Sequence, residues 1–270
     1  MLVLGSTELV AIVGSPIAQV KSPENFNQWF ARQALNRVML PIDLGATSLE
    51  SFTHTLRGWQ NLRGCVVTVP YKQQVVTLLD ELSERARALH SVNVIRREAD
   101  GRLIGDNVDG EGFLNAARQQ GFDPAGKRAV MVGTGGVGSA IAYSLAQAGL
   151  SHLHLIDVSA ERVEALASLL HKAFPALVIE RDSSSLEGVD LLINASPVGM
   201  GDAGQLPISQ ELLDTLSANT HVADVVTAPE ITALLSAAQQ RGCSIQTGPQ
   251  MARAQAGNLG HFMGATDLML

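Results

Sequence analysis

A glycine-rich turn, Gly-Thr-Gly-Gly-Val-Gly at residues 133–138, has the residue types and spacing of a phosphate-binding loop. The first glycine can take a tight turn, the second lets the backbone approach a pyrophosphate, and the last lets the next helix lie close to its strand. Apolar runs at 129–132 and 153–156 flank the turn, and Asp157 follows where a carboxylate meets the adenosine ribose. This order predicts a dinucleotide site and disfavours an ordinary glycine turn. Its residues are Gly133, Thr134, Gly135, Gly136, Val137, Gly138 and Asp157.

Two charged residues elsewhere have side chains that can exchange a proton with a substrate hydroxyl. Lys72 comes just after a predicted strand in the run Thr-Val-Pro-Tyr-Lys, and Asp109 follows a predicted hairpin in Gly-Asp-Asn-Val-Asp-Gly. Taken singly, each is better explained as an ordinary residue, a solvated lysine and a helix-capping aspartate. Ligands of open parallel sheets bind beyond the carboxyl ends of the strands, so we expect any chemistry in a cleft between two domains.

Strand and helix patterns alternate along the chain, which predicts an α/β protein with two α/β domains. The first domain begins with strands at 9–13, 38–44 and 65–69, separated by a helix with Ser22 as N-cap and a helix at 49–59. A hairpin is predicted from 92–96 and 102–104 around Asp100-Gly101. We expect a parallel-sheet substrate domain at 1–108, completed by 248–270, and a Rossmann dinucleotide-binding domain at 109–247.

Composition excludes several classes of protein. The 270 residues are 46% hydrophobic and 17% charged, which is typical of a globular protein. A net charge of −7 argues against nucleic acid as a partner, and no apolar run approaches the ~20 residues of a membrane span. The N-terminus has no basic segment before its apolar residues, so we expect no signal peptide and a cytoplasmic protein. Cys65 and Cys243 have no metal-ligand spacing and are predicted to be buried free thiols.

Several separated motifs, in matching order, make the chain similar to the shikimate/quinate dehydrogenase family. Three of these motifs are the glycine-rich turn and the runs that contain Lys72 and Asp109. The others are Gly14-Ser-Pro-Ile, Lys21-Ser-Pro, Ser91-Val-Asn, Asn194-Ala-Ser-Pro-Val-Gly-Met and Gly248-Pro-Gln-Met-Ala-Arg-Ala-Gln. The resemblance implies that Lys72 and Asp109 are the catalytic acid/base pair. It also implies that Ser22, Thr68, Asn93 and Gln255 hold the substrate's carboxylate and hydroxyls, that Asn194 and Ser196 line the nicotinamide side, and that Met251 lies near the nicotinamide. No metal is needed for this chemistry.

Valine stands at five positions where the family usually has a polar residue, namely Val20, Val66, Val94, Val108 and Val226. In the family, the residues at 20, 66 and 226 normally meet the substrate, and each missing hydrogen-bond partner costs ~1–3 kcal/mol. We therefore expect shikimate to be a poor substrate.

The predicted cofactor is NAD. NADP-dependent relatives end the second strand of the nucleotide domain with a pattern like Asn-Arg-Thr, whereas this chain has Asp157-Val158-Ser159. The arginine that would pair with a 2′-phosphate is absent and a carboxylate is present.

The sequence thus predicts an NAD-dependent oxidoreductase that interconverts shikimate, or a related cyclic hydroxy acid such as quinate or an aminated analogue, with its 3-dehydro ketone. The alternative is a non-catalytic dinucleotide-binding or sensing protein of the same family. A dehydrogenase of linear hydroxy acids is disfavoured, because it would want an arginine and a histidine in the cleft. The expected partner is a polar ring acid, with no nucleic acid or membrane. A homodimer is considered, although family members usually continue into a closing helix beyond Leu270, so we expect altered oligomerisation.

Overall fold

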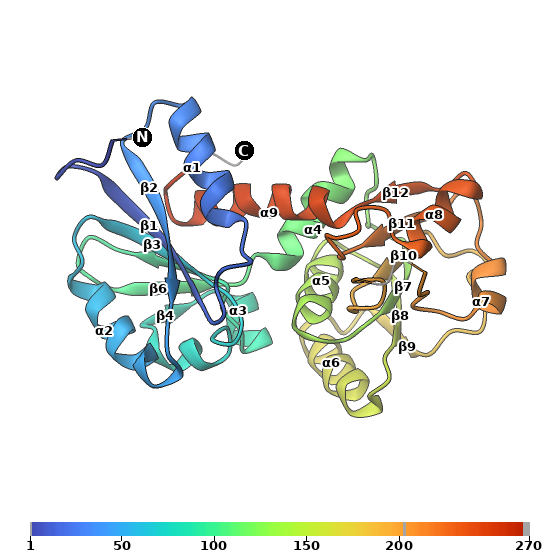
Figure 1. Ribbon diagram of the computed structural model, residues 1–270. Helices are drawn as coiled ribbons and strands as arrows, with labels where there is room; N and C mark the ends of the chain where they lie inside the picture. The colour runs from blue at the N-terminus through green and yellow to red at the C-terminus, as the bar shows by residue number, and fades with distance from the viewer. Residues whose placement is uncertain (1, 202–203, 267–270) are drawn as a thin grey trace. The chain divides into compact units, whose positions relative to one another are not determined.

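The computed structural model describes residues 2–201 and 204–266, which divide into two compact units (Figure 1). Unit 1 contains the described residues up to Val108 and from Ala256 onward, and unit 2 contains Asp109–Gln255. Residues 248–255, which the sequence placed with the first domain, are grouped with unit 2. These residues belong to unit 2 because their segment packs against residues 109–112 of that unit. A Cβ on Gly112 would lie 2.6 Å from Cβ of Gln255, and the Gln255 side-chain amide donates to Asp109. Residues 267–270 of that expected domain lie outside the described residues.

Unit 1 is built on a six-stranded sheet with the strand order β2-β1-β3-β5-β6-β4. Strands β1, β2 and β3 pair in parallel, whereas β5 pairs antiparallel with both β3 and β6. The predicted hairpin is confirmed, and because of it the sheet is mixed rather than wholly parallel. The elements are β1 (Glu8–Gly14), α1 (Ser22–Arg32), β2 (Arg37–Asp43), η1 (Ala46–Ser48), α2 (Leu49–Gly58), β3 (Leu62–Val67), η2 (Gln74–Leu78), β4 (Glu81–Leu82), α3 (Glu84–Leu89), β5 (Val94–Arg97) and β6 (Leu103–Asp106).

Strand β1, which lies between β2 and β3, is buried on both faces, as expected for a parallel strand between helical layers. Ala11 and Val13 pack into an apolar cluster with α2 and η2, whereas Val10 and Ile12 pack into a second cluster with α1. Successive side chains of a strand point to opposite faces, so one short apolar run supplies both clusters.

Helix α1 begins one residue earlier than the sequence indicated. Lys21 occupies the N-cap position and makes no capping hydrogen bond through its side chain, while Ser22 is the first helical residue. The prediction of Ser22 as N-cap was therefore wrong. Pro23 is compatible with either start, because its fixed φ suits the first turn of a helix and its missing N–H leaves one less donor to satisfy.

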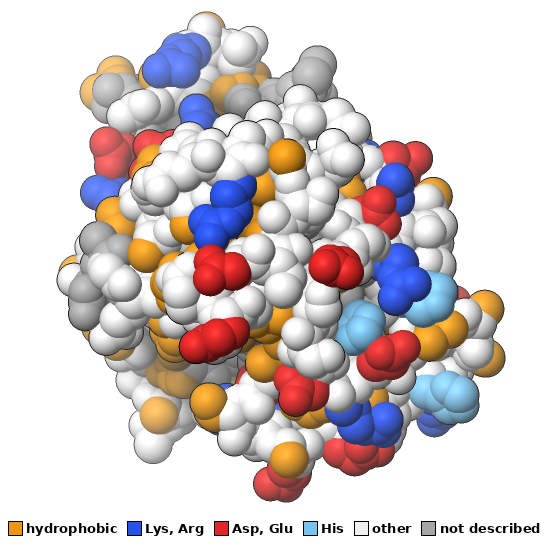
Figure 2. All heavy atoms as spheres, turned by 90° about the vertical axis from the view of Figure 1, so that its right-hand side faces the viewer, with side chains coloured by type: hydrophobic (Ala, Val, Ile, Leu, Met, Phe, Trp, Pro, Cys, Tyr) orange, Lys and Arg blue, Asp and Glu red, His pale blue; other side chains and the backbone are white. Residues whose placement is uncertain are grey.

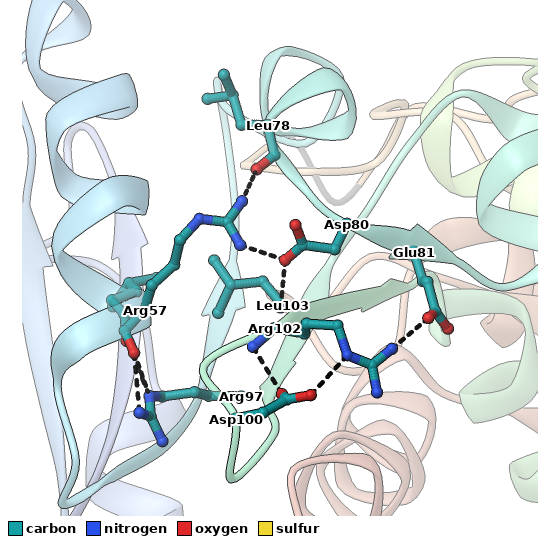
Figure 3. Close-up of polar contacts among 9 residues, drawn as sticks. Arg57, Leu78, Asp80, Glu81, Arg97, Asp100, Arg102 and Leu103 are labelled. Carbon is teal, nitrogen blue, oxygen red and sulfur yellow. Dashed lines mark hydrogen bonds and ion pairs between the residues drawn. The ribbon is translucent and has the colours of Figure 1, made fainter.

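A network of charged side chains joins α2 to the β5–β6 hairpin (Figure 3). Arg57 pairs with Asp80 and donates to the Leu78 carbonyl at 2.9 Å, and Asp80 accepts from the Leu103 amide at 2.7 Å. The Leu103 amide lowers the pKa of Asp80 against the opposing effect of burial, and Arg57 and Arg102 lower it further. This carboxylate therefore stabilises the folded state in its charged form.

We expect Asp80→Ala to lower the free energy of unfolding by about 1–3 kcal/mol at neutral pH, because it leaves the Leu103 amide and Arg57 without their acceptor. The pKa of Asp80 is lower in the folded than in the unfolded state, so its contribution is present above about pH 4 and is lost as pH falls through the folded value. Urea unfolding at pH 7 and pH 3 should thus show a difference between variant and wild type that shrinks in acid. Asp100→Ala, at an exposed carboxylate of the same network, is the control with the smaller effect.

Unit 2 has a six-stranded sheet in which every pairing is parallel, with the order β12-β11-β10-β7-β8-β9. This is the doubly wound arrangement of a Rossmann domain, so the predicted fold class is confirmed. The elements are α4 (Asp109–Gln119), β7 (Arg128–Val132), α5 (Gly136–Gln147), β8 (His152–Ile156), α6 (Ala160–Ala173), β9 (Val178–Arg181), β10 (Leu191–Asn194), α7 (Gln210–Asp214), β11 (His221–Asp224), α8 (Ala233–Gln240), β12 (Ser244–Gln246) and α9 (Gly248–Phe262), whose last seven residues belong to unit 1.

Both cysteines are buried and free, as predicted. Burial raises the pKa of the Cys65 thiol to about 12, which keeps this thiol protonated and unreactive at neutral pH. Over the described residues, none of the helices combines the length and apolar character needed to cross a bilayer. The same residues contain no cluster of three or more His, Cys, Asp or Glu side chains placed to ligate a metal ion.

Candidate active site

Three parallel strands of unit 2 end side by side at the glycine-rich turn. In the sheet register Val132 of β7 is paired with Asn194 of β10, which is paired with Asp224 of β11. The loops that follow these strands therefore leave the same edge of the sheet, where doubly wound folds bind their ligands.

Two glycines of the turn, Gly133 and Gly138, lie where a side chain would not fit. Gly133 has φ +96°, and a Cβ there would lie 2.7 Å from backbone atoms of Ala195 and Ser196. A Cβ on Gly138 would lie 2.1 Å from the Gly133 carbonyl oxygen, so only glycine lets α5 begin this close to β7. A Cβ on Gly135 or Gly136 would have nothing within 4 Å, which leaves that side of the turn open. The exposed start of a twelve-residue helix can thus face an anion.

Asp157 is held against the glycine-rich turn by three hydrogen bonds. Its Oδ2 accepts from the amide and the hydroxyl of Thr134 at 2.7 and 2.9 Å, and its Oδ1 accepts from the Ser159 amide at 2.9 Å. Burial favours a raised pKa, but these donors and the Arg162 charge outweigh it, and the pKa of Asp157 lies below the usual carboxyl value. A carboxylate has about four acceptor positions, so about one remains on Oδ1 for an incoming hydroxyl. The adjacent Val158 side chain is fully exposed.

Asn194 is fully buried, and its amide hydrogen-bonds within the protein. It donates to Asp224 Oδ1 at 3.1 Å and to the Val198 carbonyl at 3.0 Å, and it accepts from the amide and hydroxyl of Ser196 at 3.1 and 2.7 Å. Its side chain therefore shapes the loop at 194–199 from within. Met251 is 7% exposed near the start of α9.

Asp109 and Gln255, far apart in the chain, meet in unit 2. Asp109 is the first residue of α4, is 3% exposed, and accepts a hydrogen bond on Oδ1 from Gln255 Nε2. Gly112 lets α4 and α9 approach at this point. The structure thus brings together one residue predicted to be catalytic and one predicted to hold substrate.

Lys72 lies in unit 1, at the end of the segment that leaves β3. Its carbonyl accepts from the Val92 amide at 2.8 Å, and the preceding Tyr71 is buried and donates through its hydroxyl to the Leu44 carbonyl. Thr68, in the same segment, is half-buried, as are Lys72 itself and Ser22 at the start of α1. The backbone under Lys72 is therefore fixed on both sides.

Asn93 lies beside this segment in a buried polar network. Its carbonyl accepts from the Val67 amide at 2.8 Å, and its Oδ1 accepts from the Val108 amide at 2.9 Å, directly before Asp109. Asp106 completes the network, because its carbonyl accepts from the Asn93 amide at 2.9 Å and its carboxylate binds Arg85 at 2.8 and 2.7 Å. The Arg85–Asp106 pair was not predicted, although the acid inside the Gly-Asp-Asn-Val-Asp-Gly run was a signal for it.

Four of the five valines belong to one apolar cluster of unit 1. Val66, Val94 and Val108 are at most 5% exposed within it, and Val20 packs against it. These four valines therefore contribute to one shared apolar contact surface. The fifth, Val226, is 1% exposed in unit 2.

A polar hollow of about 400 Å³ in unit 2 is lined by residues of β8 and β9 and by the segment that follows β9. His154 and Arg181 line it, but each is already engaged, with Glu180 at 3.3 Å and Glu164 at 2.8 Å. On the face drawn in Figure 2, basic and acidic side chains are interspersed and form no extended patch of one sign. The hollow contains none of the predicted site residues, so we do not assign the chemistry to it.

Comparison with known proteins gives consistent results. Residues 12–95 match the shikimate dehydrogenase substrate binding domain. The shikimate dehydrogenase (NADP(+)) of Rubrobacter xylanophilus is 37% identical over 254 residues, which are 92% of this chain and 87% of that protein. Among solved structures, Listeria monocytogenes shikimate 5-dehydrogenase in complex with shikimate and NAD has a TM-score of 0.92 at 26% identity, covering 98% of this chain and 94% of the other.

A second solved structure is that of the ligand-free 5-ketofructose reductase of a Gluconobacter strain. It has a TM-score of 0.90 at 29% identity and covers 97% of this chain and 94% of the other. Together with the motifs at the strand ends, these likenesses show that the chain belongs to the shikimate dehydrogenase family of oxidoreductases.

Proposed function

We propose that the protein is an NAD-dependent oxidoreductase that interconverts a cyclic hydroxy acid of the shikimate type with its 3-dehydro ketone. The observation that carries this proposal is the glycine-rich turn with Asp157 hydrogen-bonded to Thr134 beside an exposed helix start. That arrangement fits a pyrophosphate and a ribose hydroxyl. The dinucleotide, when bound, supplies the hydride acceptor or donor.

Lys72 and Asp109 serve as the acid/base pair in this proposal. Oxidation of a secondary alcohol removes a proton from its oxygen while hydride leaves the carbon, so a basic group must contact the hydroxyl. Lys72 takes that role and returns the proton in the reverse direction, and Asp109 is the second member of the pair. Ser22, Thr68, Asn93 and Gln255 have hydroxyl and amide groups that suit the carboxylate and ring hydroxyls of such a substrate.

A second substrate class, hydroxyketones without a carboxylate, is favoured by the valines. Val20 and Val66 stand where the family usually offers polar groups, and both belong to or pack against one apolar cluster. The likeness to a 5-ketofructose reductase, an enzyme named for a ketose, points in the same direction.

Initial-rate assays with NAD against shikimate, quinate and an aminated ring acid, and with NADH against 5-ketofructose, test both classes. We expect shikimate to be oxidised with a kcat/KM well below about 10⁶ M⁻¹s⁻¹, and quinate to be weaker still because its extra hydroxyl finds fewer partners. Val20→Ser, at a half-buried position, should lower KM for shikimate and leave that for the ketose unchanged. A wild-type efficiency near the quoted value would contradict this interpretation of the valines, and no turnover of any substrate would favour a non-catalytic protein.

A further inference from the structure

Asp224 is a buried carboxylate that the proposed chemistry does not use. It is the last residue of β11 and 2% exposed, and it stands next to Asn194 in the sheet register. A carboxylate at such a site requires hydrogen-bond donors, since burying an unpaired charge is costly. The identity of those donors indicates what the residue does.

Three donors from three different segments converge on this carboxylate. Asn194 Nδ2 and the Val226 amide donate to Oδ1 at 3.1 and 3.0 Å, and the Thr232 hydroxyl donates to Oδ2 at 2.7 Å. Thr232 is also the N-cap of α8, through the Leu235 amide. Asp224 thus connects the end of β10 to the start of α8.

The bond to Asn194 determines the conformation of the loop at 194–199. With one amide hydrogen on Asp224 Oδ1 and the other on the Val198 carbonyl, the Asn194 carbonyl oxygen faces Ser196 and accepts from its amide and hydroxyl. The Ser196 hydroxyl oxygen then accepts from the Val198 amide at 3.2 Å. The same loop touches the glycine-rich turn, because Gly133 packs on Ala195 and Ser196. If the Asn194 amide rotated, its oxygen would no longer accept from Ser196, and this series of hydrogen bonds would be lost.

We propose that Asp224 is a positioning residue: by fixing the Asn194 amide it holds the loop at 194–199 in the conformation that orients the nicotinamide half of a bound dinucleotide. The inference rests on the proposed function, because it assumes that this loop faces the cofactor. It goes beyond that function because it assigns the conformation of the loop at 194–199 to Asp224, which acts through Asn194 and not by contact with cofactor or substrate.

Two substitutions separate positioning from general stability. Asp224→Ala leaves the Asn194 amide without its acceptor. Asp224→Asn keeps one oxygen to accept from the Asn194 side chain and the Val226 amide, and its NH₂ group can donate to the Thr232 hydroxyl oxygen. Asparagine has the size and shape of aspartate, so this variant keeps the packing of the site, where burial raises the pKa of Asp224 against hydrogen bonds that lower it. The matched control is Thr220→Val, which removes a buried 2.8 Å bond to the Val189 carbonyl at the opposite end of β11.

The readouts are the dissociation constants for NAD and for ADP-ribose, which lacks the nicotinamide, together with hydrogen exchange of the Ser196 and Val198 amides. We expect Asp224→Ala to weaken NAD binding and to lower kcat, each by about 10–100-fold, because small misplacements of a reacting group have effects of that size. ADP-ribose affinity should change by less than about twofold, since the nicotinamide is absent from it. The two loop amides should exchange faster, and Asp224→Asn should restore all of these values.

A purely structural role would make Asp224→Ala behave like Thr220→Val, with a lower melting temperature and unchanged ligand affinities, and that result would overturn the inference. Equal losses for NAD and ADP-ribose would also overturn it, because they would place the defect at the glycine-rich turn. If the wild type bound no dinucleotide, the proposed function itself would fail. Hydrogen exchange would still test whether Asp224 holds the loop, since it requires no ligand.

Discussion

Replacing Lys72 by alanine should lower kcat by roughly 10²–10⁴-fold while leaving the dissociation constant for NAD nearly unchanged. The expected loss is large because no other group in the proposed mechanism removes the hydroxyl proton. NAD affinity should persist because the glycine-rich turn and Asp157 belong to unit 2, whereas Lys72 belongs to unit 1. Steady-state kinetics and calorimetric titration with NAD measure the two quantities separately.

Asp109→Asn should give a comparable loss, because it keeps the shape of the side chain and an acceptor for Gln255 but removes the negative charge. Lys172→Ala, at an exposed lysine of α6, is the matched control and should retain wild-type turnover. Near-normal kcat in the Lys72 variant would remove that residue from the mechanism.

The sequence predicted the parts of the fold that depend on local patterns. The hairpin around Asp100-Gly101 and the helix following the glycine-rich turn could be identified because their turn residues and apolar periods lie within a few positions of each other. The Ser22 cap was wrong because Pro23 also suits a helix that begins one residue earlier. Such one-residue shifts are decided by backbone geometry rather than by composition.

The residues that support the candidate site were harder to find. Asp224 meets Asn194 across 30 positions and Arg85 meets Asp106 across 21, and no local pattern links the members of either pair. The clustering of Val66, Val94 and Val108 likewise arises only when three segments pack together. Single-sequence patterns report what one element prefers, whereas these contacts depend on which elements become neighbours.

The surroundings of Asp157 make a second strong prediction, on the choice of cofactor. Its carboxylate is charged at neutral pH, because Thr134 and Ser159 donate to it and hold its pKa below the usual value despite partial burial. A 2′-phosphate of about −2 charge would have to approach this carboxylate. Two like unit charges ~4 Å apart repel by ~4 kcal/mol at an effective dielectric near 20, which solvent and salt reduce. We therefore expect kcat/KM with NAD to exceed that with NADP by at least about a hundredfold, or ~2.7 kcal/mol.

The structure also determines which substitution tests this prediction most cleanly. In Asp157→Asn an NH₂ group would replace one carboxylate oxygen and would face at least one of the three hydrogen-bond donors, which would disturb the glycine-rich turn. Val158→Arg is the better variant, since the Val158 side chain is fully exposed and an arginine there meets no steric obstacle. We expect it to raise kcat/KM with NADP by about tenfold or more, because a guanidinium binds phosphate oxygens in bidentate geometry, and to leave the value with NAD within a few-fold of wild type.

Val158→Gln, similar in length but uncharged, is the control and should leave the NADP value near that of wild type. The competing cation is Arg162, which is close enough to Asp157 to contribute to its lowered pKa. If Arg162 served a 2′-phosphate, the wild type would use both cofactors about equally and Arg162→Ala would abolish the use of NADP. That pair of results would contradict the assignment of Asp157 as the residue that selects NAD, whereas a hundredfold preference unchanged by Arg162→Ala would support it.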